Sequence, residues 1–126
     1  MILGIGIDLV DVARARRLLE AKGDRALARL CTPGEAAYVR AHPLGAPSFA
    51  ARLAAKEAAY KALAGTAEAR AIGWRDIEVE RAEDGKPSLI LHGLARARAD
   101  ALGVRRIHLS LTHTDTSAGA IVILEG

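Results

Sequence analysis

The chain has little of several residue types, and each scarcity limits what the protein can do. Cys31 is its single cysteine, which excludes an internal disulfide and a thiolate metal cluster. Aromatic residues make up only 3% of the 126 residues, which argues against recognition of single-stranded nucleic acid by base stacking. No apolar run approaches the roughly 20 residues that span a bilayer. We therefore expect a cytoplasmic protein that binds neither nucleic acid nor membrane.

The remaining composition is that of a folded domain. Hydrophobic residues make up 51% of the chain and charged residues 26%, and the length suits one domain over residues 1–126. The net charge of +3 indicates either an acidic or phosphorylated partner or an ordinary arginine-rich composition. The first apolar run contains Gly4, Gly6 and Asp8 and has no basic leader, so we do not expect a secretion signal.

Residues 48–64, with the sequence SFAARLAAKEAAYKALA, predict one long central helix. They are mostly strong helix formers, with Ser48 expected as the N-cap and Gly65 as the stop. Alanine stands where a solvent-facing helix carries polar residues, so we expect protein to cover most sides of this helix. Its four charged residues therefore need partners or ligands: Arg52, Lys56, Glu57 and Lys61.

Residues 1–10 predict a strand with two different faces. Alternation puts Leu3, Ile5, Ile7 and Leu9 on one face, and Gly4, Gly6 and Asp8 on the other. Two glycines on one face allow another backbone to approach closely. The glycines lie inside the strand and a third is missing, so they are not a dinucleotide-binding fingerprint.

The other elements are predicted from periodicity and from turn residues. We expect helices over 11–22, where Asp11 is the cap, over 24–31 and over 33–42, then a Pro/Gly loop over 42–47. After a loop over 66–73, strands over 74–82 and 88–92 form a hairpin. A helix over 93–102 precedes strands over 105–114 and 116–124. The order predicts one α+β domain with an N-terminal strand, a helical middle and a three- or four-stranded antiparallel remainder.

Asp8 and Glu57 are hard oxygen ligands in a chain without metal-binding cysteine or histidine pairs. Such ligands favour Mg²⁺ or Mn²⁺ over structural Zn²⁺. Lys61, one turn after Glu57, can neutralise phosphate beside such an ion. The alternative is that Glu57 and Lys61 form an ordinary helix ion pair of about 0.3–0.5 kcal/mol and that Asp8 caps the next turn.

Three further features have more than one interpretation. His113 lies on the apolar side of its strand, where a hydrogen-bonded core histidine is the commoner explanation. Lys56 is either a snorkelling or paired side chain, or, from its place in the apolar stripe of Phe49 and Tyr60, a residue that supports the site without touching its ligands. Arg14 and Arg17, beside Leu18, either receive an acidic helix from a partner or form a solvated face.

Four segments together resemble a known family. They are GIGIDLVDV at 4–12, FAARLAAKEAAYKAL at 49–63, DGKP at 84–87 and HLSLTHT at 108–114. The chain resembles the small bacterial holo-acyl-carrier-protein synthases, which are 4′-phosphopantetheinyl transferases. The resemblance implies the phosphopantetheinyl transferase fold and a role in fatty acid biosynthesis. The implied reaction moves 4′-phosphopantetheine from coenzyme A to a serine of apo-acyl carrier protein and releases adenosine 3′,5′-bisphosphate.

The resemblance also implies a role for individual residues. Asp8 and Glu57 would hold Mg²⁺, or Mn²⁺, on the pyrophosphate, and Lys61 would complete the catalytic set beside the phosphates. The implied coenzyme A contacts are Arg52, Gly85, Lys86, Pro87 and His113. The implied carrier-protein contacts are Arg14, Arg17 and Leu18. Family members are homotrimers with sites between subunits, and the base is either Glu57 or a metal-bound water relayed by a carboxylate.

Two other functions compete with the transferase. A non-catalytic coenzyme A or carrier-protein binding module would not need Asp8, Glu57 and Lys61 together. A Mg²⁺-dependent pyrophosphohydrolase would use water in place of serine, and the basic first helix favours a protein acceptor over it.

Overall fold

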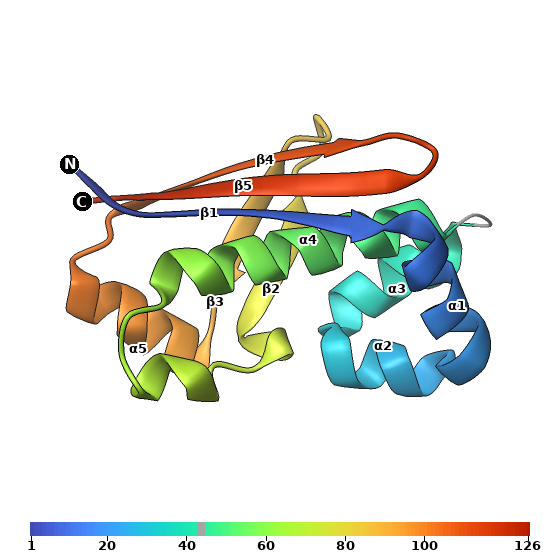
Figure 1. Ribbon diagram of the computed structural model, residues 1–126, viewed down its shortest axis with the longest axis horizontal. Helices are drawn as coiled ribbons and strands as arrows, with labels where there is room; N and C mark the ends of the chain where they lie inside the picture. The colour runs from blue at the N-terminus through green and yellow to red at the C-terminus, as the bar shows by residue number, and fades with distance from the viewer. Residues whose placement is uncertain (43–44) are drawn as a thin grey trace.

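The computed structural model describes residues 1–42 and 45–126, and these form one α+β domain (Figure 1). Its elements in chain order are β1 (Ile2–Asp11), α1 (Val12–Lys22), α2 (Asp24–Leu30), α3 (Pro33–Ala41), α4 (Gly45–Leu63), the 3₁₀ turns η1 (Glu68–Ala71) and η2 (Trp74–Asp76), β2 (Ile77–Arg81), β3 (Pro87–Leu91), α5 (Gly93–Leu102), β4 (Arg106–His113) and β5 (Ser117–Glu125). The predicted α+β class is confirmed. Part of the loop expected over 42–47 lies outside the described residues.

The strands form two antiparallel sheets. The three-stranded sheet has the order β1-β5-β4, so the last strand of the chain is its centre. In its register Asp8 pairs with Ala120, which pairs with Leu111 on the other side. The β2–β3 hairpin forms a sheet of its own. The remainder of the chain thus contributes four antiparallel strands, as predicted, but they divide between two sheets, because β5 takes the N-terminal strand and β4 as its partners.

Helix α4 runs along the inner face of the three-stranded sheet, and two glycines of β1 set how close it lies. A Cβ built on Gly6 would lie 1.8 Å from the carbonyl oxygen of Ala58, and one on Gly4 would lie 2.3 Å from that of Ala62. Only glycine permits this contact between strand and helix. The predicted close approach is confirmed.

One predicted helix cap is misplaced, and another lacks the expected side-chain hydrogen bond. Helix α4 begins at Gly45, so Ser48 is not its N-cap. Pro47 is accommodated because the first turn of a helix does not need its N–H groups for intrahelical bonds. Asp11 occupies the N-cap position of α1, but its side chain makes no capping hydrogen bond.

The segment before β2 also differs from the prediction. Residues 74–76 form the turn η2 instead of the start of a strand. The Asp76 side chain accepts a hydrogen bond from the Gly73 N–H at 2.9 Å, and this local bond competes with strand pairing. The loop expected over 66–73 contains the short turn η1.

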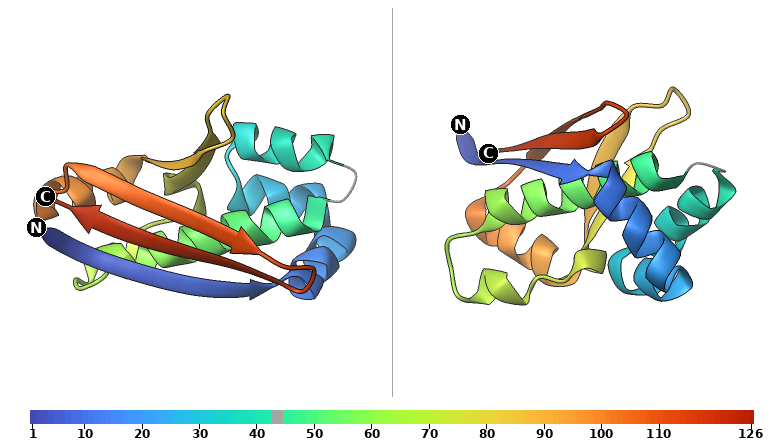
Figure 2. Two further views of the ribbon diagram at one scale, coloured as in Figure 1. Left: turned by 90° about the horizontal axis from the view of Figure 1, so that it is seen from above. Right: turned by 45° about the vertical axis from the view of Figure 1, so that its right-hand side comes forward.

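The three-stranded sheet buries one face and leaves the other open. Ala118, Ala120, Val122 and Leu124 of β5 are buried against α4. On the outer face Ile5, Ile7 and Leu9 are 60%, 66% and 75% exposed, and no other described element covers them (Figure 2, left). Among the helices in the described part of the chain, none has both the length and the apolar character needed to cross a membrane.

Candidate functional site

Strand β1 and helix α4 bring Asp8, Glu57 and Lys61 together. The Lys61 ammonium lies 2.9 Å from Asp8 Oδ1 and donates a second hydrogen bond to the Ile7 carbonyl at 3.0 Å. Lys61 of α4 therefore forms its ion pair with Asp8 of β1. Among the described residues it forms none with Glu57, so the predicted alternative of a Glu57–Lys61 helix pair is wrong. Asp8 lies within β1, three residues before the cap position of α1, so it does not cap that helix.

The two carboxyl groups are crowded. Burial and the neighbouring Asp8 carboxyl raise the pKa of Glu57 to about 7. Asp8 Oδ2 is buried and accepts no hydrogen bond from the described residues. A buried oxygen without a donor is costly, and a cation held by the two carboxylates would offset both their repulsion and the missing partner.

The donor set fits a hard divalent cation. Within residues 1–42 and 45–126 no group of three or more His, Cys, Asp or Glu side chains is arranged to hold a metal ion. Two carboxylates are what Mg²⁺ commonly takes from a protein when water and substrate phosphates complete its coordination. Asp8 Oδ2 and the Glu57 carboxylate are therefore the groups that could hold it.

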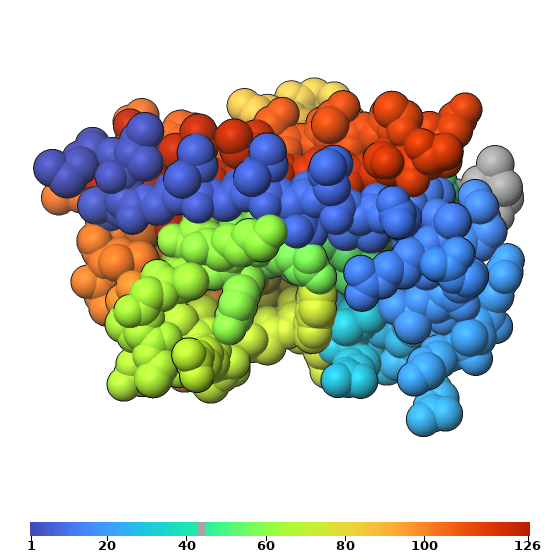
Figure 3. Space-filling model, viewed as in Figure 1, coloured from blue at the N-terminus to red at the C-terminus, as the bar shows by residue number. Residues whose placement is uncertain are grey.

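Two cavities flank Glu57, and Figure 3 shows the surface hollowed beneath β1. The first cavity, of about 400 Å³, is lined by Glu57, Tyr60, Lys61, Arg70 and Trp74 among others. The second, of about 320 Å³, is a groove along α1 and α2. Glu57 and Trp74 line both, so the two cavities adjoin each other at these residues.

The groove is basic. Its cationic side chains are Arg14, Lys22, Arg25 and Arg29, and Leu18 adds apolar surface. Of the predicted carrier contacts, Arg14 and Leu18 therefore line the groove, whereas Arg17 is exposed outside it. The prediction missed Lys22, Arg25 and Arg29, although the recurrence of basic residues along 14–29 was a signal for them.

The predicted coenzyme A contacts lie elsewhere in the chain. Arg52 is buried on another side of α4, where its Nη1 donates to Ser48 Oγ at 2.6 Å and its guanidinium stacks on Tyr38 at 4.2 Å. Gly85, Lys86 and Pro87 lie at the β2–β3 turn. None of these residues, nor His113, lines the two cavities beside Glu57. In a single chain the predicted site therefore falls into two separate sets.

His113 is not a core residue. It ends β4, an edge strand of its sheet, and its side chain is exposed. The expectation of a hydrogen-bonded core histidine is wrong, because no described element packs over this end of the edge strand.

Lys56 has a buried partner that the sequence did not reveal. Its side chain is 1% exposed and its Nζ lies 2.7 Å from Glu35 Oε1. The pattern Thr32-Pro-Gly-Glu35 is a capping box, and Thr32 N–H does donate to Glu35 Oε1 at 2.9 Å. A capping box predicts a helix start, but it gives no indication that the same carboxylate also pairs with Lys56. Of the interpretations of Lys56, the paired side chain is confirmed.

Comparison with known proteins gives consistent matches. The sequence pattern of the 4′-phosphopantetheinyl transferase superfamily matches residues 4–117. A holo-[acyl-carrier-protein] synthase of Anaeromyxobacter sp. (strain K) is 53% identical over 129 residues, covering 100% of this chain and 98% of that protein. The structure of the Neisseria meningitidis synthase gives a TM-score of 0.86 at 28% identity, with 100% of both chains covered. The Bacillus anthracis str. Ames synthase, solved in complex with CoA (3′,5′-ADP), gives 0.78 at 32% identity, covering 98% of this chain and 96% of that chain.

Proposed function

The chain belongs to the 4′-phosphopantetheinyl transferase superfamily, within its holo-[acyl-carrier-protein] synthases, and from this premise we propose how its residues divide the reaction. The enzyme transfers 4′-phosphopantetheine from coenzyme A to a serine of apo-acyl carrier protein and releases adenosine 3′,5′-bisphosphate. The observation that carries the proposal is the meeting of two cavities at Glu57, beside Asp8 and Lys61.

Asp8 and Glu57 hold Mg²⁺, for which Mn²⁺ can substitute. This assignment is supported by the unpartnered Asp8 Oδ2 and by the crowding of the two carboxyls. When bound, the ion neutralises the pyrophosphate and makes its β-phosphorus a better electrophile. Lys61, whose side chain is 55% exposed, extends into the first cavity and stabilises the negative charge that develops on the leaving bisphosphate.

Glu57 stands between donor and acceptor. A pyrophosphate in the first cavity and a serine entering from the groove meet at its carboxylate. This position lets Glu57 accept the proton of the serine hydroxyl, directly or through one water, as the oxygen attacks the β-phosphorus.

The basic groove receives the carrier protein. An acidic helix fits a surface with Arg14, Lys22, Arg25 and Arg29 around the apolar Leu18. Arg17, exposed on α1 outside the groove, extends the positive field that steers the carrier toward it.

The enzyme works as a homotrimer whose sites lie between subunits. The outer face of the sheet carries Ile5, Ile7 and Leu9, and β5 adds Ile121 and Ile123 opposite Ile7 and Ile5. An apolar face of this kind needs a partner.

Trimer formation also accounts for the separation of the two predicted sets of residues. The coenzyme A contacts Arg52, Gly85, Lys86, Pro87 and His113 then serve the Asp8–Glu57 pair of a neighbouring subunit. The cytoplasm, where the free thiol of Cys31 stays reduced, is the compartment in which we expect this enzyme to supply fatty acid biosynthesis with holo-carrier.

One assay separates the transferase from its rivals. The enzyme is incubated with coenzyme A, Mg²⁺ and apo-acyl carrier protein, and the carrier is weighed by mass spectrometry. Transfer adds about 340 Da, the mass of the phosphopantetheine group that the cofactor carries. An unmodified carrier with hydrolysed coenzyme A identifies a pyrophosphohydrolase, and unchanged substrates identify a binding module.

A further inference from the structure

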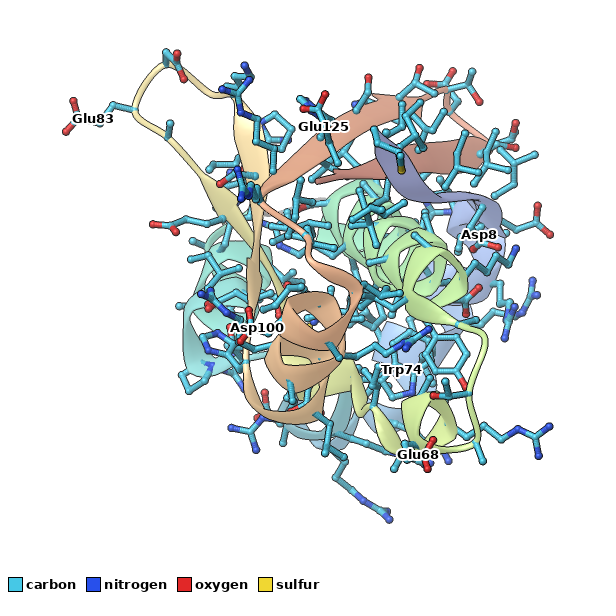
Figure 4. The ribbon with its side chains drawn as sticks, turned by 90° about the vertical axis from the view of Figure 1, so that its left-hand side faces the viewer. Asp8, Glu68, Trp74, Glu83, Asp100 and Glu125 are labelled. Carbon is cyan, nitrogen blue, oxygen red and sulfur yellow. The ribbon has the colours of Figure 1, made fainter. Side chains whose placement is uncertain are left out.

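Trp74 lies at the boundary between the two cavities. It is the only tryptophan of the chain, it is partly buried, and it is the one aromatic residue that lines both cavities together with Glu57. Figure 4 labels Trp74, and Asp8 above it in that view. Trp74 therefore borders both the first cavity and the groove.

The backbone that carries Trp74 is held by Lys56. The Lys56 ammonium donates to the carbonyls of Trp74, at 2.8 Å, and of Ile77, so it binds both ends of the turn η2. Its third N–H group donates a hydrogen bond to Glu35 Oε1. All three donors of the ammonium are thus used, and their directions fix the turn against α4.

Glu35 completes the clamp. Its Oε2 accepts the Val79 N–H at 2.9 Å, and its Oε1 accepts the Thr32 N–H. The buried pair thereby joins α3, α4, η2 and β2, which are separate in sequence. Since Lys56 precedes Glu57 on the same helix, the clamp holds the backbone of Trp74 in place relative to Glu57.

We propose that Lys56 is a positioning residue that acts through Trp74, holding the indole beside Glu57 as the surface on which the phosphopantetheine arm is seated during transfer. The arm is long, with a branched alkyl segment and amides, and an indole offers it a flat apolar surface with little freedom to lose. The proposal rests on the proposed function, because it assumes that the arm crosses at Glu57.

Trp74→Ala and Trp74→Phe form the first test, with Arg75→Ala, an exposed neighbour in the same turn that lines neither cavity, as the matched control. We expect Trp74→Ala to lower kcat by about 10²-fold, the usual effect of misplacing a reacting group by 1 Å. Its KM for coenzyme A should stay within about twofold of the wild-type value. The ring is proposed to position the arm in the transition state, not to bind ground state and transition state equally. Trp74→Phe should recover most of kcat, and Arg75→Ala should match the wild type.

The second test addresses Lys56 through the fluorescence of the single tryptophan. Removing one partner of a buried pair is strongly destabilising, so Glu35→Gln and Lys56→Met are combined in one variant. The amide oxygen of the introduced glutamine can still accept the hydrogen bond of the Val79 N–H. We expect acrylamide to quench the fluorescence of Trp74 more strongly in this variant than in the wild type, and we expect a lower kcat. Both are measured at a temperature where circular dichroism shows a folded protein. If the double variant does not fold, Lys56→Arg takes its place, because it keeps the charge of the buried pair but not the geometry of the three ammonium donors.

Wild-type kcat in Trp74→Ala, or wild-type quenching with reduced kcat in the clamp variant, would overturn the proposal. A wild-type enzyme that fails to modify the carrier would instead refute the proposed function, so the two failures are distinguishable.

Discussion

Gly6→Ala should damage both the fold and the reaction, because Gly6 sets the distance between β1 and α4. The added Cβ would lie 1.8 Å from the Ala58 carbonyl oxygen and 2.8 Å from its carbonyl carbon. Both atoms belong to the helix backbone, so no side-chain rotation relieves the contact. Ordinary contact begins near 3.4 Å, and β1 must therefore retreat by roughly 1.5 Å.

The magnitude follows from that retreat. Overpacking a well-packed interior costs about 1–3 kcal/mol, and a clash of backbone with backbone places this variant at the upper end, near 3 kcal/mol. Asp8 lies two residues further along β1 and moves with the strand. A displacement of 1 Å or more of a reacting group costs about 10² in rate, so kcat should fall by about that factor in the molecules that remain folded.

Urea unfolding followed by circular dichroism gives the stability, and mass spectrometry of the carrier gives the rate. Gly34→Ala is the matched control: Gly34 lies in α3, and its added Cβ would meet Glu78 Oε2 at an ordinary 3.6 Å. The control should be as stable as the wild type or up to about 1 kcal/mol more stable. A Gly6→Ala enzyme with wild-type stability and rate would refute the reasoning that these glycines position Asp8.

Three further predictions concern surfaces and the thiol. Arg14→Glu should raise the KM for the carrier about tenfold, equivalent to about 1.4 kcal/mol, without changing the KM for coenzyme A. Arg16→Glu, outside the groove, should leave both KM values unchanged. An unchanged carrier KM in Arg14→Glu would show that Arg14 is merely solvated. In the proposed trimer Ile7→Asp would bury a charge, so this variant should be monomeric in light scattering. Leu94→Asp on α5 should not change the oligomeric state, and a trimeric Ile7→Asp would place the interface elsewhere. Burial, and then the nearby Glu35, raise the pKa of the Cys31 thiol from 9.0 to about 11; iodoacetamide should thus label the native protein about 10²-fold more slowly than the urea-unfolded one, and equal rates would contradict this.

Local patterns were enough to predict most elements of the fold. Gly23 and Gly103 end α1 and α5 where the sequence predicted, since each glycine takes a positive φ that other residues rarely adopt. The alternation in β1 correctly separated the glycine face from the isoleucine face. These features depend only on neighbours within a few residues, and such short-range physics can be inferred from one sequence.

The errors have one local and one long-range cause. Ser48 is a good N-cap by type, but α4 extends to Gly45, and Ser48 instead accepts a hydrogen bond from Arg52. Trp74 has high strand propensity, yet its carbonyl is bound by Lys56 from another element. The contact between Lys56 and Trp74, which are 18 positions apart, leaves no periodic signal in the sequence.

The candidate site could be predicted only in part. Asp8, Glu57 and Lys61 carry chemistry that their residue types suggest, and the glycines indicated that β1 and α4 meet. The Glu35–Lys56 pair joins residues 21 positions apart, and the role of Trp74 depends on a cavity that forms only when η2 packs on α4. The separation of Arg52 from Asp8 in one chain likewise depends on the three-dimensional fold.

The central claim is that Glu57 acts with Asp8 at the point where donor and acceptor meet. The most direct measurement is the mass of apo-carrier after incubation with coenzyme A, Mg²⁺ and Glu57→Gln enzyme, with its trimer and circular dichroism checked against the wild type. Removing a group that takes the serine proton should lower the rate by at least about 10²–10⁴-fold, so the carrier should stay unmodified while the trimer remains folded. A Glu57→Gln enzyme that modifies the carrier at the wild-type rate would contradict the account.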